Sequence, residues 1–343
     1  MKFKAAILYK KNNPLLIQEI SLKDPIGYGQ ILVKIKYSGI CGSQIGEISG
    51  KKKDKFLPHL LGHEGYGKVV EKGAGVKNVE IDDIVILHWK VGSGIQSKNP
   101  TYYLKDKPIN AGWVTTFNQY AVVSENRVTK IQNRLKDSYI YPLFGCAVPT
   151  AFGAVENLAK VKFGQKIIII GVGGIGLSIL QACKFLNSKE IFCVDIDKKK
   201  LDFAKSLGAT KTKLVSEISP TTKQKLIGNF DHCFENTGYN KNIEFGYDCI
   251  NSKGKLILIG VPKENHKSKI FTLDLHFGKE IIGCHGGNVN PSFDIPRYIN
   301  FFKNKQNELK KIITNKDTLD NINKTINHMK KSKIVGRSII SLW

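Results

Sequence analysis

The residues of this chain that could bind a metal ion are two cysteines and a histidine. Cys41, His63 and Cys146 offer two thiolates and one imidazole. Two sulfur ligands and one nitrogen ligand, with a fourth position left open, are typical of a catalytic zinc site. An ion held in this way acts as a Lewis acid on a substrate oxygen. The three residues lie far apart in the sequence, so the set predicts a site only together with other motifs.

A second group of residues could bind phosphate groups. Gly171-x-Gly173-x-x-Gly176 directly follows the β-branched run Lys166–Ile170, which predicts a strand buried on both faces. Glycines let the backbone turn sharply and approach a pyrophosphate, and the first N–H groups of the following helix point at it. This strand–loop–helix context predicts a dinucleotide site. The loop residues assigned to it are Gly171, Gly173, Gly174, Ile175 and Gly176.

Asp195 completes the dinucleotide motif. It ends the apolar run Ile191–Val194, which predicts the second strand of the unit. An acidic side chain at this position can bind both hydroxyls of an adenosine ribose, and it repels the 2′-phosphate of NADP. The motif therefore favours NAD. Lys198–Lys200 follow closely, and we interpret them as the solvated face of the next helix.

The predicted elements place these motifs in two domains. Strands and helices alternate between residues 148 and 288, which is typical of a doubly wound parallel sheet. Residues 1–147 consist mainly of predicted strands, and 289–343 are mostly helical before a last strand at Ile334–Leu342. We therefore predict an α/β dinucleotide-binding domain, 148–288, inserted into a mainly-β domain formed by 1–147 and 289–343.

Two segments beside the motifs need separate predictions. Residues 90–112 contain Gly92, Gly94, Pro100 and Pro108, which predicts a long irregular excursion. Phe144–Lys160 predicts a helix that leads into the dinucleotide motif.

Charge narrows the range of partners. The chain has 343 residues and a formal net charge of +24, but only four of its 53 basic residues are arginine. Arginine is the residue that binds bases and phosphates in a bidentate manner. The lysines are spread along the chain, with clusters only at Lys51–Lys53 and Lys330–Lys333. We therefore expect no nucleic-acid partner, whereas an anionic small-molecule substrate is compatible with this charge.

Hydropathy and cysteine usage indicate a compartment. No run of 18 apolar residues is present, so no membrane span is predicted. The N-terminal residues lack the apolar core of a signal peptide. The seven cysteines are scattered and odd in number, which favours reduced thiols and a cytoplasmic protein.

The motifs together resemble a known family. Gly39-Ile40-Cys41-Gly42-Ser43, Gly62-His63-Glu64-x-x-Gly67 and the glycine loop come in the order and spacing of the zinc-dependent medium-chain alcohol dehydrogenases. The resemblance covers nearly the whole chain. It implies a GroES-like, mainly-β catalytic domain around a Rossmann-type domain. It also implies hydride transfer between NAD(H) and an alcohol or its aldehyde or ketone, and a homodimer or homotetramer.

The resemblance also implies residue roles. Cys41, His63 and Cys146 would hold the catalytic zinc, with Glu64 as a further or transient ligand. Ser43 would pass the alcohol proton toward the cofactor, and Arg337 would contact the cofactor pyrophosphate. Trp89 would limit the substrate pocket. His88 is more consistent with a structural role than with metal binding.

The departures from the family carry information as well. Residues 84–145 contain no cysteine, whereas many relatives bind a second, structural zinc there through four cysteines, so one catalytic zinc is expected. Gln44 and Gly46 stand where relatives often have an aspartate and a proton-relaying histidine. Gln44 brings no negative charge to the ligand shell, and the exit route of the proton is unassigned.

Two other functions stay open at this point. A zinc-free, NADPH-dependent quinone-reductase-like enzyme has the same fold, but such proteins usually lack the Cys41, His63 and Cys146 set. A polyanion-binding protein that keeps the fold would use its positive surface, but it would not need the metal and dinucleotide motifs. The sequence does not identify the alcohol or carbonyl substrate.

Overall fold

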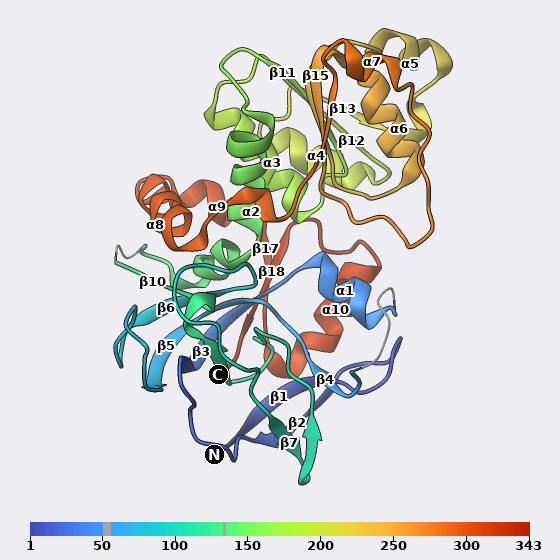
Figure 1. Cartoon of the computed structure of the whole chain (residues 1–343). Helices are drawn as coiled ribbons and strands as arrows, with labels where there is room; N and C mark the ends of the chain where they lie inside the picture. Colours follow the sequence, from blue (N-terminus) through green and yellow to red (C-terminus); the bar gives the residue numbers. More distant parts are fainter. Residues whose placement is uncertain (51–55, 133–134) are drawn as a thin grey trace. The chain divides into compact units, whose positions relative to one another are not determined.

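The computed structural model describes residues 1–50, 56–132 and 135–343 (Figure 1). The lysine cluster Lys51–Lys53 lies outside the described residues. The chain forms two compact units, of which the first combines Met1–Pro149 with Asn290–Trp343 and the second is Thr150–Val289.

The second unit contains a six-stranded parallel sheet. Its order is β13-β12-β11-β14-β15-β16. The strands are β11 (Lys166–Ile170), β12 (Glu190–Asp195), β13 (Lys211–Leu214), β14 (Phe230–Glu235), β15 (Ile250–Leu258) and β16 (Glu280–Gly283). β11, β12 and β13 follow one another toward one edge of the sheet, and β14, β15 and β16 follow one another toward the other edge. The chain reverses direction across the sheet between β11 and β14. Ligands of such sheets bind at this reversal, outside the carboxyl ends of the strands. The predicted doubly wound sheet is confirmed.

Helices connect these strands. They are α3 (Gly174–Phe185), α4 (Lys198–Leu207), α5 (Pro220–Leu226), α6 (Asn240–Cys249) and α7 (Leu273–His276), with short 3-10 turns η4 (Val215–Glu217) and η5 (Gly286–Asn288). Ile167–Ile170 are fully buried, as expected for a central strand covered on both faces. The sequence analysis does not predict β13, because Lys211 and Lys213 interrupt any apolar pattern in this edge strand.

The first unit contains two sheets. The smaller has the order β4-β1-β2-β7-β8; the larger has the order β10-β6-β5-β3-β18-β17, and β9 also pairs with β3. The strands are β1 (Lys2–Leu8), β2 (Leu16–Ser21), β3 (Gln30–Ile40), β4 (His59–Leu60), β5 (Glu64–Lys72), β6 (Ile84–His88), β7 (Tyr102–Leu104), β8 (Lys107–Ile109), β9 (Tyr120–Ser124), β10 (Val128–Lys130), β17 (Ile313–Thr318) and β18 (Arg337–Ser341). Apolar side chains of β3, β5, β6, β9 and β18 form one buried core with α10 (Ile322–Lys330).

The other helical segments of the chain are short. They are α1 (Gly42–Ile48), η1 (Glu125–Arg127), η2 (Ser138–Gly145), α2 (Ala147–Gly153), the π-helix η3 (Ala154–Ala159), α8 (Pro291–Phe302), α9 (Gln306–Ile312) and η6 (Leu319–Asn321). In the described part of the chain no single helix is both long and apolar enough to cross a membrane. The bent pair Ser138–Gly145 and Ala147–Ala159 satisfies that test only by length and composition.

Three predictions about elements need correction. The irregular excursion 90–112 contains a hairpin, β7–β8, whose turn uses positive φ angles at Lys105 and Asp106. Lys23 holds this turn through Asp106 at 2.7 Å. The helical tail contains β17, in which partly buried and exposed residues alternate with the period of a strand. The helix predicted at Phe144–Lys160 is interrupted at Cys146, whose backbone is not helical (φ −154°, ψ −63°).

Candidate functional site

Strand register brings Cys41 and His63 together. β3 pairs antiparallel with β5, and Ser38 lies opposite Gly65. Cys41 directly follows β3 and His63 directly precedes β5, so both residues lie at the same end of this pair. β18 pairs with the other edge of β3, with Ser338 opposite Ile40, and this adds Arg337 to the same end of the sheet.

Cys146 reaches the same place through a break in a helical segment. It separates η2 from α2, and Gly145 precedes it. A Cβ atom at Gly145 would lie 2.9 Å from Glu64 Cα and 2.6 Å from the carbonyl oxygen of Leu87. Only glycine therefore lets this turn pack directly against β5 and β6. That close approach places the Cys146 side chain beside Glu64.

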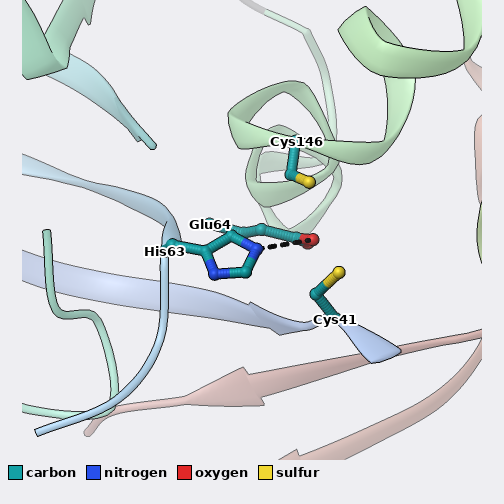
Figure 2. A group of neighbouring side chains, drawn as sticks. All are labelled: Cys41, His63, Glu64 and Cys146. Carbon is teal, nitrogen blue, oxygen red and sulfur yellow. Dashed lines mark ion pairs between the residues drawn. The ribbon is translucent and has the colours of Figure 1, made fainter. Parts of the chain in front are cut away.

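The four candidate ligands form one cluster (Figure 2). One ligand atom from each of Cys41, His63, Glu64 and Cys146 lies within 4.8 Å of the others. Zinc bonds of about 2.0–2.3 Å in a tetrahedron separate ligand atoms by roughly 3.4–3.8 Å. The donor set is thus of the right type and within reach of a single ion.

Glu64 shows that the cluster suits a cation. Its side chain is fully buried, and Oε1 has no hydrogen-bond partner among the described residues. The same oxygen lies 3.9 Å from His63 Nε2, the contact drawn in Figure 2. A buried carboxylate oxygen without a partner is costly unless a cation or donor occupies the space beside it. The residues present therefore fit a divalent metal.

The two cysteines of the cluster shift each other's pKa in opposite directions. Hydrogen bonds from Cys146 and His63 hold the pKa of Cys41 well below its ordinary value, although burial opposes this shift. The Cys41 sulfur in turn holds the proton on Cys146, and together with burial this raises the pKa of Cys146 well above its ordinary value. The thiolate is the form that binds a metal, so a cation bound here would displace the thiol proton of Cys146.

Arg337 lies inside the cluster. It is 3% exposed, and its guanidinium forms an ion pair with Glu64 Oε2. Burial raises the pKa of Glu64, and Arg337 opposes the rise. A Cβ atom at Gly39 would clash with the same carboxylate oxygen, so Gly39 leaves the space that this pair occupies. The sequence analysis assigns Arg337 to the cofactor pyrophosphate, whereas in the structure its partner is Glu64.

Gln44 contacts the second nitrogen of the His63 imidazole. Its side chain is 3% exposed, and Nε2 lies 3.1 Å from His63 Nδ1. Its Oε1 accepts a hydrogen bond of 2.5 Å from the backbone N–H of Gly62. The neutral amide noted in the sequence thus lies against the second ring nitrogen of His63.

The remaining predicted residues lie around the cluster. Ser43 is exposed in the first turn of α1, two residues after Cys41. Trp89 is half-buried, and the Trp89 carbonyl accepts a hydrogen bond from Arg127. Trp89 directly follows His88, which lies opposite Glu64 on the neighbouring strand. His88 is buried with Nδ1 2.7 Å from the Lys90 carbonyl and Nε2 3.0 Å from Thr129 Oγ1. His88 is not part of the metal cluster.

The glycine loop lies in the second unit. It connects β11 to α3, which begins at Gly174. Val172 donates its backbone N–H to Asp195 Oδ2 at 2.8 Å, so the loop and the acidic residue at the end of β12 are joined directly. A Cβ atom at Gly176 would clash with the carbonyl of Gly171. Gly173, Gly174 and Ile175 are partly exposed, so their backbone is accessible to a ligand.

The sequence analysis does not predict a role for Glu235. This fully buried residue ends β14 and accepts hydrogen bonds from the backbone of Thr237 (2.8 Å) and Gly238 (2.9 Å) and from the Thr237 hydroxyl. Thr237 Cγ2 lies 2.7 Å from where a Gly171 Cβ would be. Glu235 thus holds the loop after β14 against the glycine loop. The available signal is the same as for Asp195, an acidic residue that ends an apolar strand.

Two family sequence models match the chain. One is described as "Zinc-binding dehydrogenase" and matches residues 174–304. The other is described as "Alcohol dehydrogenase GroES-like domain" and matches residues 27–133. Together they cover more than half of the chain, one on each side of Cys146.

Full-length relatives agree with these matches. The chain is 29% identical to an S-(hydroxymethyl)glutathione dehydrogenase of Paracoccus denitrificans, over 99% of this chain and all of that protein. It is also 29% identical to alcohol dehydrogenase 6 of Peromyscus maniculatus, over 98% of this chain and 96% of that protein. Among solved structures, benzyl alcohol dehydrogenase of Acinetobacter calcoaceticus superposes with a TM-score of 0.90 over both full chains at 24% identity, which is a likeness of fold.

Proposed function

The chain belongs to the zinc-dependent medium-chain dehydrogenase/reductase family and is a zinc-dependent alcohol oxidoreductase, and from this premise we propose that Cys41, His63 and Cys146 hold its catalytic zinc. The observation that carries the proposal is the cluster of ligand atoms within 4.8 Å of one another. The buried Glu64 Oε1, which has no hydrogen-bond partner among the described residues, supports it.

The chemistry divides between the bound groups and the side chains. A zinc ion held by these residues would supply a Lewis acid for the substrate oxygen, and a bound NAD would supply the hydride acceptor. Glu64 carries the charge that balances Arg337, and it is near enough to serve as a further ligand. Ser43 is the hydroxyl nearest in sequence to Cys41, and we assign it the first proton transfer away from the alcohol. Trp89 is proposed as a wall of the substrate pocket.

The enzyme uses NAD(H), and we propose that the loop from Gly171 to Gly176 binds its pyrophosphate. Asp195 is proposed to bind the adenosine ribose and to exclude the 2′-phosphate of NADP. Its hydrogen bond to Val172 supports this assignment, because it ties the carboxylate to the loop that faces the phosphates. Arg337 could bind the cofactor pyrophosphate only if its guanidinium first breaks the ion pair with Glu64.

The substrate is an alcohol or the corresponding aldehyde or ketone. We propose that it is anionic, because the chain carries a net charge of +24, which would draw an anion toward it. Four of the relatives are named S-(hydroxymethyl)glutathione dehydrogenase, and that substrate carries carboxylates. S-(hydroxymethyl)glutathione is therefore the first compound to assay. Uncharged primary and secondary alcohols form the comparison set.

We propose that each chain binds a single zinc and that two copies associate through the second unit. The absence of cysteine from residues 84–145 supports the first proposal. The second rests on the edge strand β16 and on exposed apolar side chains in the segment before it, at Phe271 (65%), Leu273 (50%) and Phe277 (69%). Phe277→Asp should then convert the assembly to monomers in sedimentation. Reduced thiols support a cytoplasmic location.

One preparation tests the proposed function. We expect about one zinc per chain by elemental analysis, tight NADH binding by fluorescence titration, and oxidation of an alcohol followed as NADH absorbance. A protein that holds no zinc and prefers NADPH would instead be a quinone-reductase-like enzyme. Salt-sensitive retention on nucleic acid, with neither zinc nor NADH bound, would favour the polyanion-binding alternative.

A further inference from the structure

One buried arginine of the first unit has no carboxylate partner. Arg127, in η1, is 4% exposed, and among the described residues it forms no ion pair with an acidic side chain. Its Nε atom is buried and has no hydrogen-bond partner in the same part of the chain. A buried cation without a carboxylate costs free energy, so the contacts that Arg127 does make must offset that cost.

The guanidinium of Arg127 joins three points of the chain. Nη1 donates a hydrogen bond to the backbone carbonyl of Trp89, and Nη2 donates one of 3.2 Å to Gln96 Oε1. The guanidinium carbon lies 4.4 Å from the centre of the Trp113 ring. Trp89 directly precedes the 90–112 excursion, Gln96 lies within it, and Trp113 directly follows it. Arg127 thus connects both ends of the excursion.

The backbone beside Arg127 binds the same excursion. Gly92 donates its N–H to the carbonyl of Asn126 at 2.8 Å, and Asn126 donates its own N–H to the carbonyl of Ile95 at 3.3 Å. The residues after Trp89 are therefore held against η1 by backbone hydrogen bonds. The Trp89 carbonyl itself is bound by the Arg127 side chain.

The contacts of Arg127 require a guanidinium. Its five N–H donors lie in one plane, so it can bind a carbonyl and an amide oxygen at the same time while it stacks on an indole. A lysine carries its charge on a single nitrogen at the end of a flexible chain. At this position it could bind one of the two acceptors, but it could not bind both and also lie flat against Trp113.

We infer that Arg127 is a positioning residue of the substrate pocket, which fixes the backbone of Trp89 and with it the indole that limits the pocket. This inference rests on the proposed function, in which Trp89 is a wall of that pocket. In the described contacts Arg127 does not touch the metal cluster, so it acts through Trp89. A wall whose backbone is released can move, and the enzyme should then discriminate less between small and large alcohols.

The first test follows Trp89 by its fluorescence. The chain has three tryptophans, so Trp113→Phe together with Trp343→Phe leaves Trp89 as the only one, and a phenylalanine at 113 keeps a ring for the guanidinium. In this background Arg127→Met removes the donors and the charge but keeps a long side chain. We expect acrylamide to quench Trp89 more strongly and its emission maximum to shift to longer wavelength. Circular dichroism checks that the fold is intact.

The second test compares two uncharged alcohols of different size, with zinc and NAD bound to the full chain. For Arg127→Met the ratio of kcat/KM for benzyl alcohol to that for ethanol should rise about fivefold, with bound zinc and NADH affinity unchanged. Arg127→Lys should change the ratio in the same direction but less. Arg297→Met is the matched control and should change neither the ratio nor the quenching. Arg297 belongs to the same unit and lies 4.5 Å from the centre of the Tyr298 ring, but its side chain is 51% exposed.

The outcomes distinguish the inference from the proposed function. A natural chain that binds no zinc and oxidises no alcohol would contradict the proposed function, and the quenching of Trp89 would still decide whether Arg127 holds it. If Arg127→Met leaves the quenching of Trp89 unchanged, the role of Arg127 is wrong. The role is also wrong if the quenching rises and the alcohol ratio stays the same, since Trp89 would then not limit the pocket. Should Arg127→Met fail to fold, changes of both quantities in Arg127→Lys would support the inference, and no change in either one would overturn it.

Discussion

At the level of single side chains, the proposed metal site depends on two sulfurs that lie close together. The Cys41 thiol has a lowered pKa and the Cys146 thiol a raised one, because each acts on the other at short range. Glu64 and Arg337 add a second buried pair beside them. A buried carboxylate oxygen that has no hydrogen-bond partner in the described chain, as Glu64 Oε1 has none, is more stable with a cation beside it than without one.

Removing one sulfur tests this arrangement. Cys146→Ala should lower bound zinc from about one to well below one per chain and abolish alcohol oxidation, because two ligands are left. The fold should persist, since the side chain removed is small. Cys193→Ala, which removes a buried thiol of β12 far from the cluster in sequence, is the control and should keep its zinc. Undiminished zinc and activity in Cys146→Ala would contradict the assignment.

Asp195 is the residue on which we expect the preference for NAD over NADP to depend. Its Oδ2 binds the backbone of Val172 and its Oδ1 that of Asp197 at 3.0 Å, so the carboxylate sits at the end of β12 with little freedom. Asp195→Gly removes the charge that repels a 2′-phosphate, and Lys198–Lys200 follow directly. The ratio of kcat/KM for NAD to that for NADP should fall at least tenfold. An unchanged ratio would mean that another residue binds the ribose.

At the level of elements, buried carboxylates hold the loops around both sites. Glu125, in η1, is 2% exposed and accepts hydrogen bonds from the backbone of Lys77 (2.6 Å), Asn78 (2.8 Å) and Ile95 (2.8 Å). It therefore joins the loop after β5 to the start of the 90–112 excursion. A buried carboxylate and the β7–β8 hairpin thus both help to hold this excursion in place.

Glu125→Gln should destabilise the protein. The variant loses the charge that strengthens three hydrogen bonds, and an amide N–H would then face backbone donors, so we expect a loss of about 3 kcal/mol in urea unfolding. These bonds hold the pKa of Glu125 below its ordinary value, although burial opposes them. The stabilisation by the Glu125 carboxylate is thus complete above the ordinary pKa of a glutamate. It is lost as the pH falls through the lower pKa that Glu125 has in the folded chain. Glu71→Gln, on an exposed part of β5, should change stability by less than about 0.5 kcal/mol.

Glu235 has the corresponding role beside the glycine loop. Glu235→Gln would weaken the hydrogen bonds that hold Thr237 and Gly238 and so loosen the loop that packs on Gly171. NADH affinity in a fluorescence titration should fall about tenfold, which corresponds to about 1.4 kcal/mol. Glu264→Gln, on the surface of the same unit, should bind NADH normally. Equal NADH affinity in both variants would show that this loop does not shape the cofactor site.

For the molecule as a whole, stability should depend on pH through buried neutral histidines. His232 is 4% exposed, its Nε2 lies 3.0 Å from Gln165 Oε1, and burial lowers its pKa to about 4. In the unfolded chain a histidine has an ordinary pKa near 6.5. Between these values the unfolded chain binds a proton that the folded chain does not, so stability is complete above about pH 6.5 and falls as the pH drops toward 4.

Urea unfolding at pH 7.5 and pH 5.0 measures this contribution. The natural chain should lose about 2 kcal/mol between the two values from His232 alone. His232→Gln keeps a donor toward Gln165 but takes up no proton. Its free energy of unfolding should therefore fall by about 2 kcal/mol less than that of the natural chain between the two pH values. His88, whose pKa is also lowered to about 4 by burial, is retained in both proteins and cancels in the comparison. Equal losses in the two proteins would contradict the assignment.

Much of the architecture could be predicted from local sequence patterns. The run Lys166–Ile170, the glycine motif and Asp195 all lie within about thirty residues, where side-chain period and turn chemistry act directly. The parallel sheet and the division of strands between segments followed from the same patterns. β13 and β17 were missed because lysine and asparagine interrupt their alternation, and the β7–β8 hairpin because its prolines and glycines indicated only a loop.

Residue types alone determined which side chains could bind a metal and a dinucleotide, because thiolates, imidazoles and glycines have those capacities in any fold. Only the tertiary structure decided which of them meet. The pair Glu64–Arg337 is joined by strand register, and Cys146 reaches Cys41 through a broken helical segment. Such contacts arise from pairing between distant segments, which local pattern does not encode.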